Sequence, residues 1–259
     1  MIFVLSPAKS LDYDTPSPAD LAPTTPKFMP EAAELISVLK TKRPHEVAAL
    51  MELSDSLAAL NVGRYAAWST RSTARNSKPA VLAFDGDVYD GLQAKTLGPD
   101  DLAWAQQHVA ILSGLYGVLR PLDKLQPYRL EMGTALATGR GRTLYEFWGD
   151  TIARHLNQRL KADASPVLVN LASQEYFRSV DLRVLKARVV ECVFEDWKDG
   201  RYKIISFFAK KARGLMARHA ITQRIGTPQG LERFTLDGYA FAPGVSEPDR
   251  LVFRRRLAG

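Results

Sequence analysis

The chain has 259 residues, of which 46% are hydrophobic and 24% are charged, so its composition disfavours disordered, collagen-like and membrane proteins. Its single cysteine, Cys192, excludes an intramolecular disulfide or a cysteine-rich metal site and suits a reducing compartment. The net charge is +7, and the apolar start at Met1 is too short and too poor in basic residues for a signal peptide. We therefore expect a cytoplasmic protein that does not enter the membrane.

The first third of the chain shows one strand signal followed by helix signals. Ile2–Leu5 is predicted to be a buried strand, and the five prolines from Pro16 to Pro30 predict an extended, non-helical segment. Apolar residues at helical spacing then predict helices over Glu31–Lys40, over His45–Leu53 and from Ser54 onward. Pro44 is the starting signal of the second helix and Ser54 that of the third.

The middle of the chain alternates apolar runs with helical patterns, as expected for buried strands in a mixed α/β domain. The predicted strands are Ala80–Phe84, Val109–Leu112 and Val167–Val169. The clearest amphipathic helix is predicted over Leu144–Leu160.

The strongest local signal near the C-terminus is a β-hairpin. Ala187–Trp197 and Arg201–Phe208 are joined through Lys198-Asp199-Gly200, and Asp-Gly tolerates the positive φ of a tight turn. A helix from about Ala209 to Arg224 and a final strand over Leu251–Arg254 are predicted to follow. Without a repeat or a Gly/Ser linker, residues 1–259 are expected to form a single mixed α/β domain, with one mixed sheet and surrounding helices.

The excess of positive charge is concentrated in the predicted C-terminal helix and the segment before it. Between Gly200 and Leu231 there are seven Lys and Arg and no acidic residue. At about 100° per residue, Lys210, Arg213 and Gly214 share one face of the helix, while apolar residues occupy the opposite arc. Such a basic face either binds phosphates or is only a solvated surface. Gly214 within it would let a phosphate or another backbone approach closely.

Other motifs give weaker signals. Leu57–Arg64 is a possible hairpin between short helices, as in a helix-hairpin-helix, although Ala59 and Asn61 replace the expected glycines. Ser6-Pro7-Ala8-Lys9 fits the S-x-x-K spacing of penicillin-recognising enzymes but lacks the partner motifs, so Lys9 is interpreted as a phosphate-facing cation or a structural ion-pair partner.

Metal and redox chemistry have little support in the pattern of residues. The four histidines are scattered, and the carboxylates Asp87 and Glu131 suit turn capping and pairing with arginines as well as a divalent cation. Cys192 lies in a predicted strand with an alternating pattern of residues, which favours a buried, inert thiol. We therefore assign no catalytic residue, no metal site and no cofactor.

Long segments of the chain resemble the YaaA family of bacterial peroxide-stress proteins. The resemblance is carried by residues 6–13 (SPAKSLDY), 86–89 (GDVY), 112–121 (LSGLYGVLRP), 126–133 (QPYRLEMG), 147–150 (FWGD), 170–173 (NLAS) and 209–216 (AKKARGLM). It implies a mixed α/β domain with a basic cleft and a helix-hairpin-helix-like element. It also implies DNA binding without marked sequence preference and a part in limiting iron-linked peroxide damage.

On this basis DNA, duplex or branched, is the expected partner, and a monomer is the expected state. The residues expected to contact DNA are Lys9, Arg64, Arg120, Arg129, Lys210, Lys211, Arg213 and Arg218. The alternative is an enzyme, a hydrolase or transferase, acting on a phosphorylated substrate around Lys9, Asp87, Arg129 and Glu131. Clustered cations with few acid/base pairs favour binding over catalysis.

Overall fold

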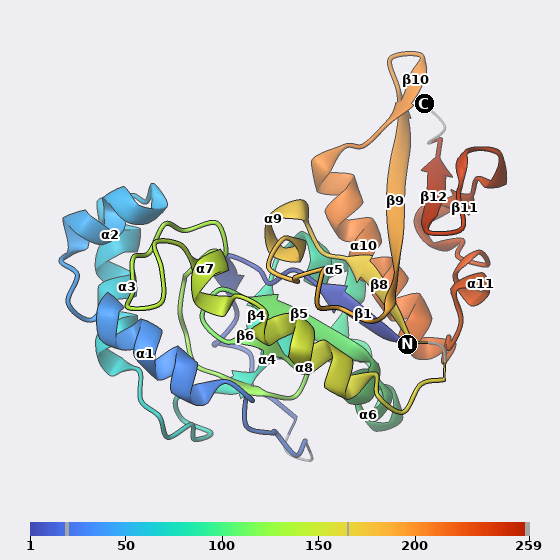
Figure 1. The fold of residues 1–259 in the computed structure, drawn as a ribbon. Coiled ribbons are helices and arrows are strands. Elements are labelled where there is room, and N and C mark those ends of the chain that lie inside the picture. Colours follow the sequence, from blue (N-terminus) through green and yellow to red (C-terminus); the bar gives the residue numbers. More distant parts are fainter. Residues whose placement is uncertain (19–20, 165, 257–259) are drawn as a thin grey trace.

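A mixed sheet organises the fold and has eight strands within the described residues of this computed structural model, 1–18, 21–164 and 166–256 (Figure 1). Its central strands are parallel, and β6, β10 and β11 pair antiparallel at its margins. In order across the sheet the strands are β11 (Ala240–Phe241), β12 (Arg250–Arg255), β9 (Arg188–Lys198), β8 (Val167–Leu171), β1 (Ile2–Leu5), β5 (Val109–Ser113) and β6 (Gly117–Leu119), with β10 (Arg201–Lys203) paired to β9.

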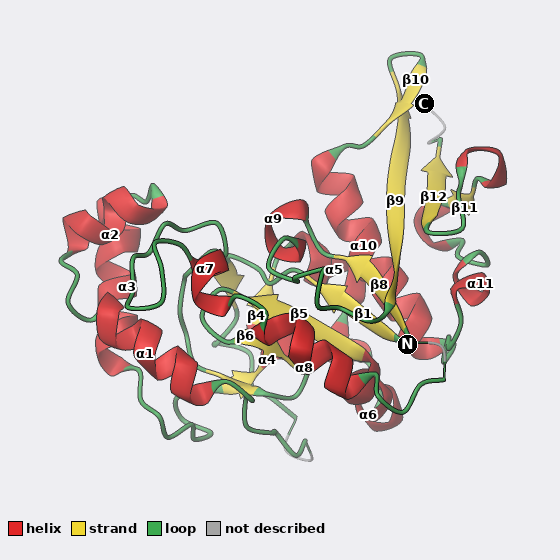
Figure 2. Ribbon diagram, viewed as in Figure 1, coloured by secondary structure: helices red, strands yellow, loops and turns green. Residues whose placement is uncertain are grey.

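Helices cover both faces of this sheet. In Figure 2, α8 lies in front of the central strands, α5, α6 and α10 lie behind them, and α1 to α3 form a group at one side. The helices are α1 (Met29–Leu39), α2 (Pro44–Met51), α3 (Asp55–Ala67), α4 (Ala80–Ala83), α5 (Asp87–Leu92), α6 (Pro99–His108), α7 (Leu144–Trp148), α8 (Thr151–Arg159), α9 (Gln174–Phe177), α10 (Ser206–Thr222) and α11 (Pro228–Leu231). Two small two-stranded sheets pair β2 (Ser10–Leu11) with β4 (Phe84–Asp85), and β3 (Lys78–Pro79) with β7 (Lys124–Leu125).

The predicted mixed α/β class is confirmed, and so are several predicted elements. Strand β1 is flanked by parallel neighbours on both sides, so its four residues are all buried and its sequence is apolar throughout. The side chain of Ser54 caps α3 by accepting a hydrogen bond from the backbone N–H of Leu57, and Pro44 opens α2. The Asp199-Gly200 turn, at φ 54° and 78°, joins β9 to β10.

Three predicted elements are wrong in type or extent. Residues 80–84 form the buried helix α4 and only the start of β4, because a short run buried on all sides carries no periodicity. The single helix predicted over 144–160 is divided into α7 and α8, because Gly149 at φ 46° ends α7. The second hairpin strand stops at Lys203, since β10 is an edge strand, and α10 begins already at Ser206.

The tightest contact between helices is the crossing of α5 and α10. A Cβ atom added to Gly214 of α10 would lie 1.8 Å from the carbonyl oxygen of Val88, and one added to Gly91 of α5 would lie 2.1 Å from the carbonyl oxygen of Lys211. The two backbones are therefore in direct contact where neither helix has a side chain. Gly214 admits another backbone here, and its buried position against α5 excludes a bound phosphate.

This crossing predicts that Gly214→Ala destabilises the fold. The clash with a backbone carbonyl should outweigh the gain in helix propensity and lower the free energy of unfolding by about 1–3 kcal/mol. Gly63→Ala, inside α3 with nothing within 4 Å of the added Cβ, is the matched control and should raise it by about 0.5–1 kcal/mol. Denaturant titration measures both, and equal effects of the two substitutions would contradict the close crossing.

Candidate functional site

The loop that leaves the carboxyl end of β1 is held between two other segments. The Ser6 hydroxyl accepts a hydrogen bond from the backbone N–H of Ser173 at 2.9 Å, and the Ser6 carbonyl accepts one from the hydroxyl of Tyr89 at 3.1 Å. Burial raises the pKa of Tyr89 well above its ordinary value, so the phenol stays protonated as a donor. Ser6 thus joins β8 and α5 to β1 at the edge of the sheet where parallel α/β proteins commonly bind ligands.

Lys9, at the end of this loop, forms a charged cluster with Arg129 and Glu131. The Lys9 ammonium lies 2.8 Å from one oxygen of Glu131, and the Arg129 guanidinium lies 3.0 Å from the other. The Lys9 side chain is 64% exposed, whereas those of Glu131 and Arg129 are 21% and 16% exposed. Lys9 is therefore the solvent-facing cation of an ion-paired cluster, and its amine is engaged by Glu131, which gives the S-x-x-K interpretation no support.

Arg64 adds a third cation beside this cluster. The hydroxyl of the neighbouring Tyr65 donates a hydrogen bond to the backbone carbonyl of Arg129, which brings α3 against residues 129–131. Burial lowers the pKa of Arg64, and the nearby charge of Arg129 lowers it further. The polar partner of Arg64 is Asn61 at 3.5 Å, and no described carboxylate pairs with it. Lys9 and Arg129 thus share one carboxylate, and Arg64, close enough to Arg129 to feel its charge, adds a further cation beside them.

The space next to Arg64 is a cavity of about 220 Å³. It is lined by the aromatic rings of Tyr13 and Trp68, by the cations Arg64 and Arg75, and by the amide of Gln126. Arg75 has no counterpart in the sequence prediction, because no motif distinguishes it from other exposed arginines. A cavity that combines aromatic surface with guanidinium groups suits a planar group that carries negative charge.

The cations of α10 are more strongly engaged by the protein than the helical pattern suggests. Lys210 is 52% exposed and lies 3.8 Å from Asp87 of α5, and Lys211 lies 3.7 Å from Asp237. Burial lowers the pKa of Arg213, which lies near Glu191 of β9. Of these three, Lys210 is the most available to a ligand.

Arg218 holds α5 in place. Its guanidinium donates hydrogen bonds to the carbonyls of Leu92 and Gln93 at 3.1 and 3.2 Å and to the hydroxyl of Thr96 at 2.9 Å. Leu92 is the last residue of α5 and Gln93 is its C-cap, where carbonyls lack partners within the helix. The sequence assigned Arg218 to DNA; the structure gives it three internal partners.

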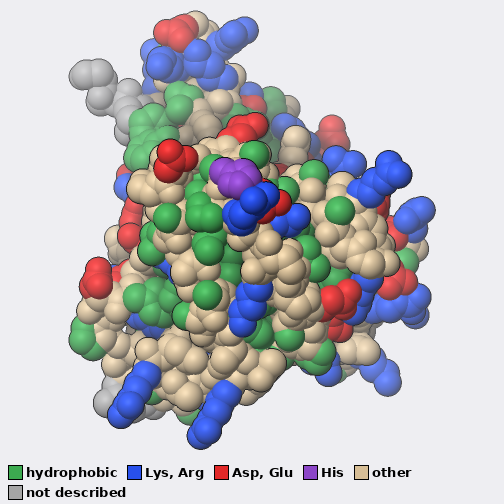
Figure 3. All heavy atoms as spheres, turned by 90° about the vertical axis from the view of Figure 1, so that its left-hand side faces the viewer, with side chains coloured by type: hydrophobic (Ala, Val, Ile, Leu, Met, Phe, Trp, Pro, Cys, Tyr) green, Lys and Arg blue, Asp and Glu red, His purple; other side chains and the backbone are tan. Residues whose placement is uncertain are grey.

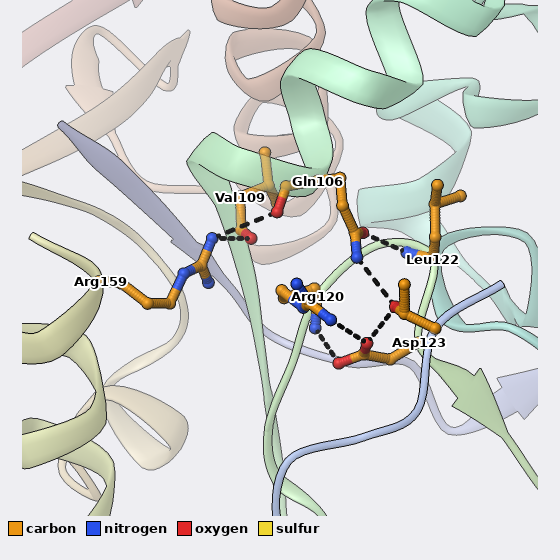
Figure 4. A network of polar contacts seen from close by, with 7 residues as sticks. Gln106, Val109, Arg120, Leu122, Asp123 and Arg159 are labelled. Atoms are coloured by element: carbon orange, nitrogen blue, oxygen red, sulfur yellow. Dashed lines mark hydrogen bonds and ion pairs between the residues drawn. The ribbon is translucent and has the colours of Figure 1, made fainter. Parts of the chain in front are cut away.

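Arg120 lies apart from the other predicted residues. It follows β6, which runs antiparallel to β5, and it pairs with Asp123 at 3.4 Å. Its position is therefore near the amino end of β5, opposite the edge that carries Ser6 and Lys9 (Figure 4). The predicted set is thus divided between two edges of the sheet.

The hairpin predicted within residues 57–64 is wrong. These residues lie inside the continuous helix α3, where Asn61 is buried and donates a hydrogen bond to the carbonyl of Leu57 at 2.8 Å. The chain reverses earlier, between α2 and α3, with Glu52 in the left-handed conformation. The Asn61 side-chain amide finds its hydrogen-bond acceptor within the helix, so this asparagine is compatible with continuous helix and does not mark a turn.

The surface shows no single dominant patch on the face displayed in Figure 3. Lys and Arg side chains are spread over it, with a group at the top where the β9–β10 hairpin projects. The hairpin carries Lys198, Arg201 and Lys203, and its Trp197 ring lies under the Arg256 guanidinium at 4.7 Å. The predicted basic cleft is not confirmed, and on this face the cations form local groups rather than one continuous lining.

Among the described residues, no group of three or more His, Cys, Asp and Glu is placed to hold a metal ion. Cys192 is buried, as predicted, and burial raises the pKa of its thiol. None of the helices described is both long and apolar enough to cross a membrane.

Comparison with known proteins identifies the family. The family model described as "Peroxide stress protein YaaA" matches residues 1–244. The chain belongs to the YaaA family. Proteins named "UPF0246 protein" from Paracidovorax citrulli, Leptothrix cholodnii and Verminephrobacter eiseniae are 68%, 65% and 64% identical to it, and the matches cover at least 98% of each chain. Membership of the YaaA family supports a role in the response to peroxide stress.

The contacts of Arg218 predict that it acts in stability. Arg218→Met should lower the free energy of unfolding by about 1–3 kcal/mol, because it removes charged hydrogen bonds to groups that follow α5. Arg201→Ala, at an exposed position of the hairpin, should change it by less than about 0.5 kcal/mol. Thermal and urea unfolding compare the two, and an unchanged stability of Arg218→Met would refute the structural role.

Proposed function

We propose that this YaaA-family protein binds DNA through backbone phosphates at the carboxyl edge of its sheet. The observation that carries the proposal is that Lys9 and Arg129, which are remote in sequence, share the carboxylate of Glu131, with Arg64 as a further cation beside Arg129. A surplus of cations at an exposed edge attracts a polyanion, and phosphate contacts carry no base sequence. Lys210, on α10 beside the same loop, adds a further exposed cation.

Binding to DNA phosphates would link this protein physically to peroxide damage. Ferrous iron that condenses on DNA phosphates reduces peroxide beside the bases, and a protein that neutralises phosphates releases such counterions. We propose that displacement of phosphate-bound iron is the means by which the protein limits iron-linked peroxide damage. The neighbouring aromatic cavity, with Trp68 and Tyr13, would favour unstacked or branched DNA, in which a base is free to enter.

The binding test removes the two most exposed cations of this edge. Lys9→Ala with Lys210→Ala should weaken binding similarly for unrelated duplexes, and the slope of log K against log salt should become shallower by up to about 1.8, at roughly 0.9 per phosphate. Fluorescence anisotropy at several salt concentrations measures both quantities.

The matched control is Lys161→Ala with Lys186→Ala, which removes the same charge from exposed positions near the amino ends of β8 and β9. It should leave affinity nearly unchanged. If the control weakens binding as much as the test variant does, net charge rather than this edge is responsible, and the proposed site is wrong.

The enzyme alternative uses the same cluster, and Glu131→Gln separates the two. A binding surface should gain affinity for duplex DNA by roughly two- to five-fold, since an exposed ion pair that competes for Lys9 and Arg129 is worth on the order of 1 kcal/mol. An enzyme that needs the carboxylate would instead hydrolyse p-nitrophenyl phosphate in the wild type and lose that activity in the variant. Reduced DNA affinity in Glu131→Gln would contradict the binding proposal.

A further inference from the structure

A second group of cations lines a cavity at the amino edge of the sheet. The cavity has a volume of about 380 Å³. The charged and aromatic residues that line it come from distant parts of the chain: Lys27, Arg120, Asp123, His155 and Arg159. Arg159 donates hydrogen bonds to the carbonyls of Gln107 and Val109, where α6 ends and β5 begins. This cavity therefore lies at the opposite end of β5 from Ser6 and Lys9.

The Arg159 guanidinium is fixed but incompletely used. One terminal nitrogen, Nη2, donates to the carbonyl of Gln107 at 2.8 Å and to that of Val109 at 3.2 Å. The other, Nη1, is buried and has no hydrogen-bond partner in the described parts of the chain. Burial lowers the pKa of Arg159 to about 10, and the charge of Arg120 adds to this shift. An unpaired, buried charged donor is costly to maintain unless a ligand satisfies it.

His155 also lines this cavity and carries a second buried atom without a partner. Its ring packs edge-on against Phe28 at 5.3 Å, and its Nδ1 atom is buried without a partner among the described residues. Burial lowers the pKa of His155 to about 4, followed by the charges of Arg159, Lys27 and Arg120. The imidazole is therefore neutral at pH 7, and its Nδ1–H tautomer can donate to an anion.

The cavity also has a surplus of charge. Its single lining carboxylate is Asp123, whose oxygens accept hydrogen bonds from the backbone N–H of Arg120 at 2.8 Å, from the Arg120 side chain at 3.4 Å and from the hydroxyl of Thr24 (Figure 4). Asp123 is thus committed to Arg120 and the loop around it. Three cations against one carboxylate leave two positive charges for a ligand.

We propose that this cavity binds a phosphate group, either inorganic phosphate or the terminal group of a phosphomonoester. A doubly charged tetrahedral oxyanion matches the charge surplus, and the guanidinium groups of Arg120 and Arg159, which line the cavity, are donors suited to its oxygens. Lys27, exposed at the rim, would close over the outer oxygens. The site is separate from the proposed DNA surface, because the two lie at opposite edges of the sheet.

Titration calorimetry of the full chain with inorganic phosphate, against sodium chloride of equal ionic strength, tests the proposal. We expect saturable one-to-one binding, reduced about tenfold in Arg159→Lys, because a single ammonium cannot hold the backbone carbonyls and also present a second donor, and about three- to tenfold in His155→Phe and Lys27→Ala. Arg159 also anchors backbone carbonyls, so Lys27→Ala, at an exposed position, keeps the test valid if Arg159→Lys unfolds.

The control is Lys161→Ala, which removes an exposed charge outside this cavity and should leave phosphate affinity unchanged. Absence of saturable binding up to about 10 mM phosphate, or equal binding by the wild type and the three cavity variants, would overturn the proposal.

A competition experiment identifies where the phosphate comes from. If saturating phosphate leaves the affinity for a 20-base-pair duplex unchanged, the occupant is a free phosphate or phosphomonoester. If phosphate displaces the duplex from the wild type but not from Lys27→Ala, the occupant is a backbone phosphate of DNA. The Lys9 and Lys210 double variant should bind inorganic phosphate normally, so failure of the DNA proposal and failure of this one give different results.

Discussion

The direct contact between the backbones of α5 and α10, at Gly91 and Gly214, positions much of the carboxyl edge of the sheet. With α10 packed on α5, Lys210 faces Asp87 and Arg218 reaches the carbonyls that follow α5. Helix α5 in turn places the Tyr89 hydroxyl on the Ser6 carbonyl at the end of β1. A side chain at either glycine would separate the helices and shift these contacts together, because packed interiors have little free volume.

Several cations of the basic stretch between Gly200 and Leu231 have partners within the folded protein. The guanidinium of Arg218 binds backbone carbonyls, and that of Arg224 pairs with Asp101 at 2.7 Å. Cations outnumber carboxylates at two places where residues from separate segments meet. One such place surrounds Glu131 and the other surrounds Asp123. The total of +7 still attracts polyanions at long range, while these two places decide where a phosphate can be held.

The two edges of the sheet offer different kinds of recognition. At the carboxyl edge Lys9 and Lys210 are long, exposed side chains, suited to weak, salt-dependent contacts with an extended polymer. At the amino edge Arg159 is fixed by carbonyls before any ligand arrives, and pre-organised donors suit a discrete phosphate group. The parallel strands β1 and β5 separate the two places, so one chain can present both without competition for the same residues.

The sequence by itself determined the fold class, strand β1, the cap of α3, the turn of the β9–β10 hairpin and the family, since these depend on local patterns and long matching runs. It misplaced a hairpin within α3, because Asn61 is also a turn residue and its hydrogen bond within the helix leaves no mark on the sequence. It misplaced the strand at residues 80–84, because a short buried apolar run looks alike in a helix and in a strand. The tertiary structure alone assigned Gly214 to a helix crossing and Arg218 to α5, and brought Lys27 and Arg120 to Arg159. A partner across the fold leaves no mark on the spacing of residues along the chain, so only packing decides which cations are satisfied and which remain open to a ligand.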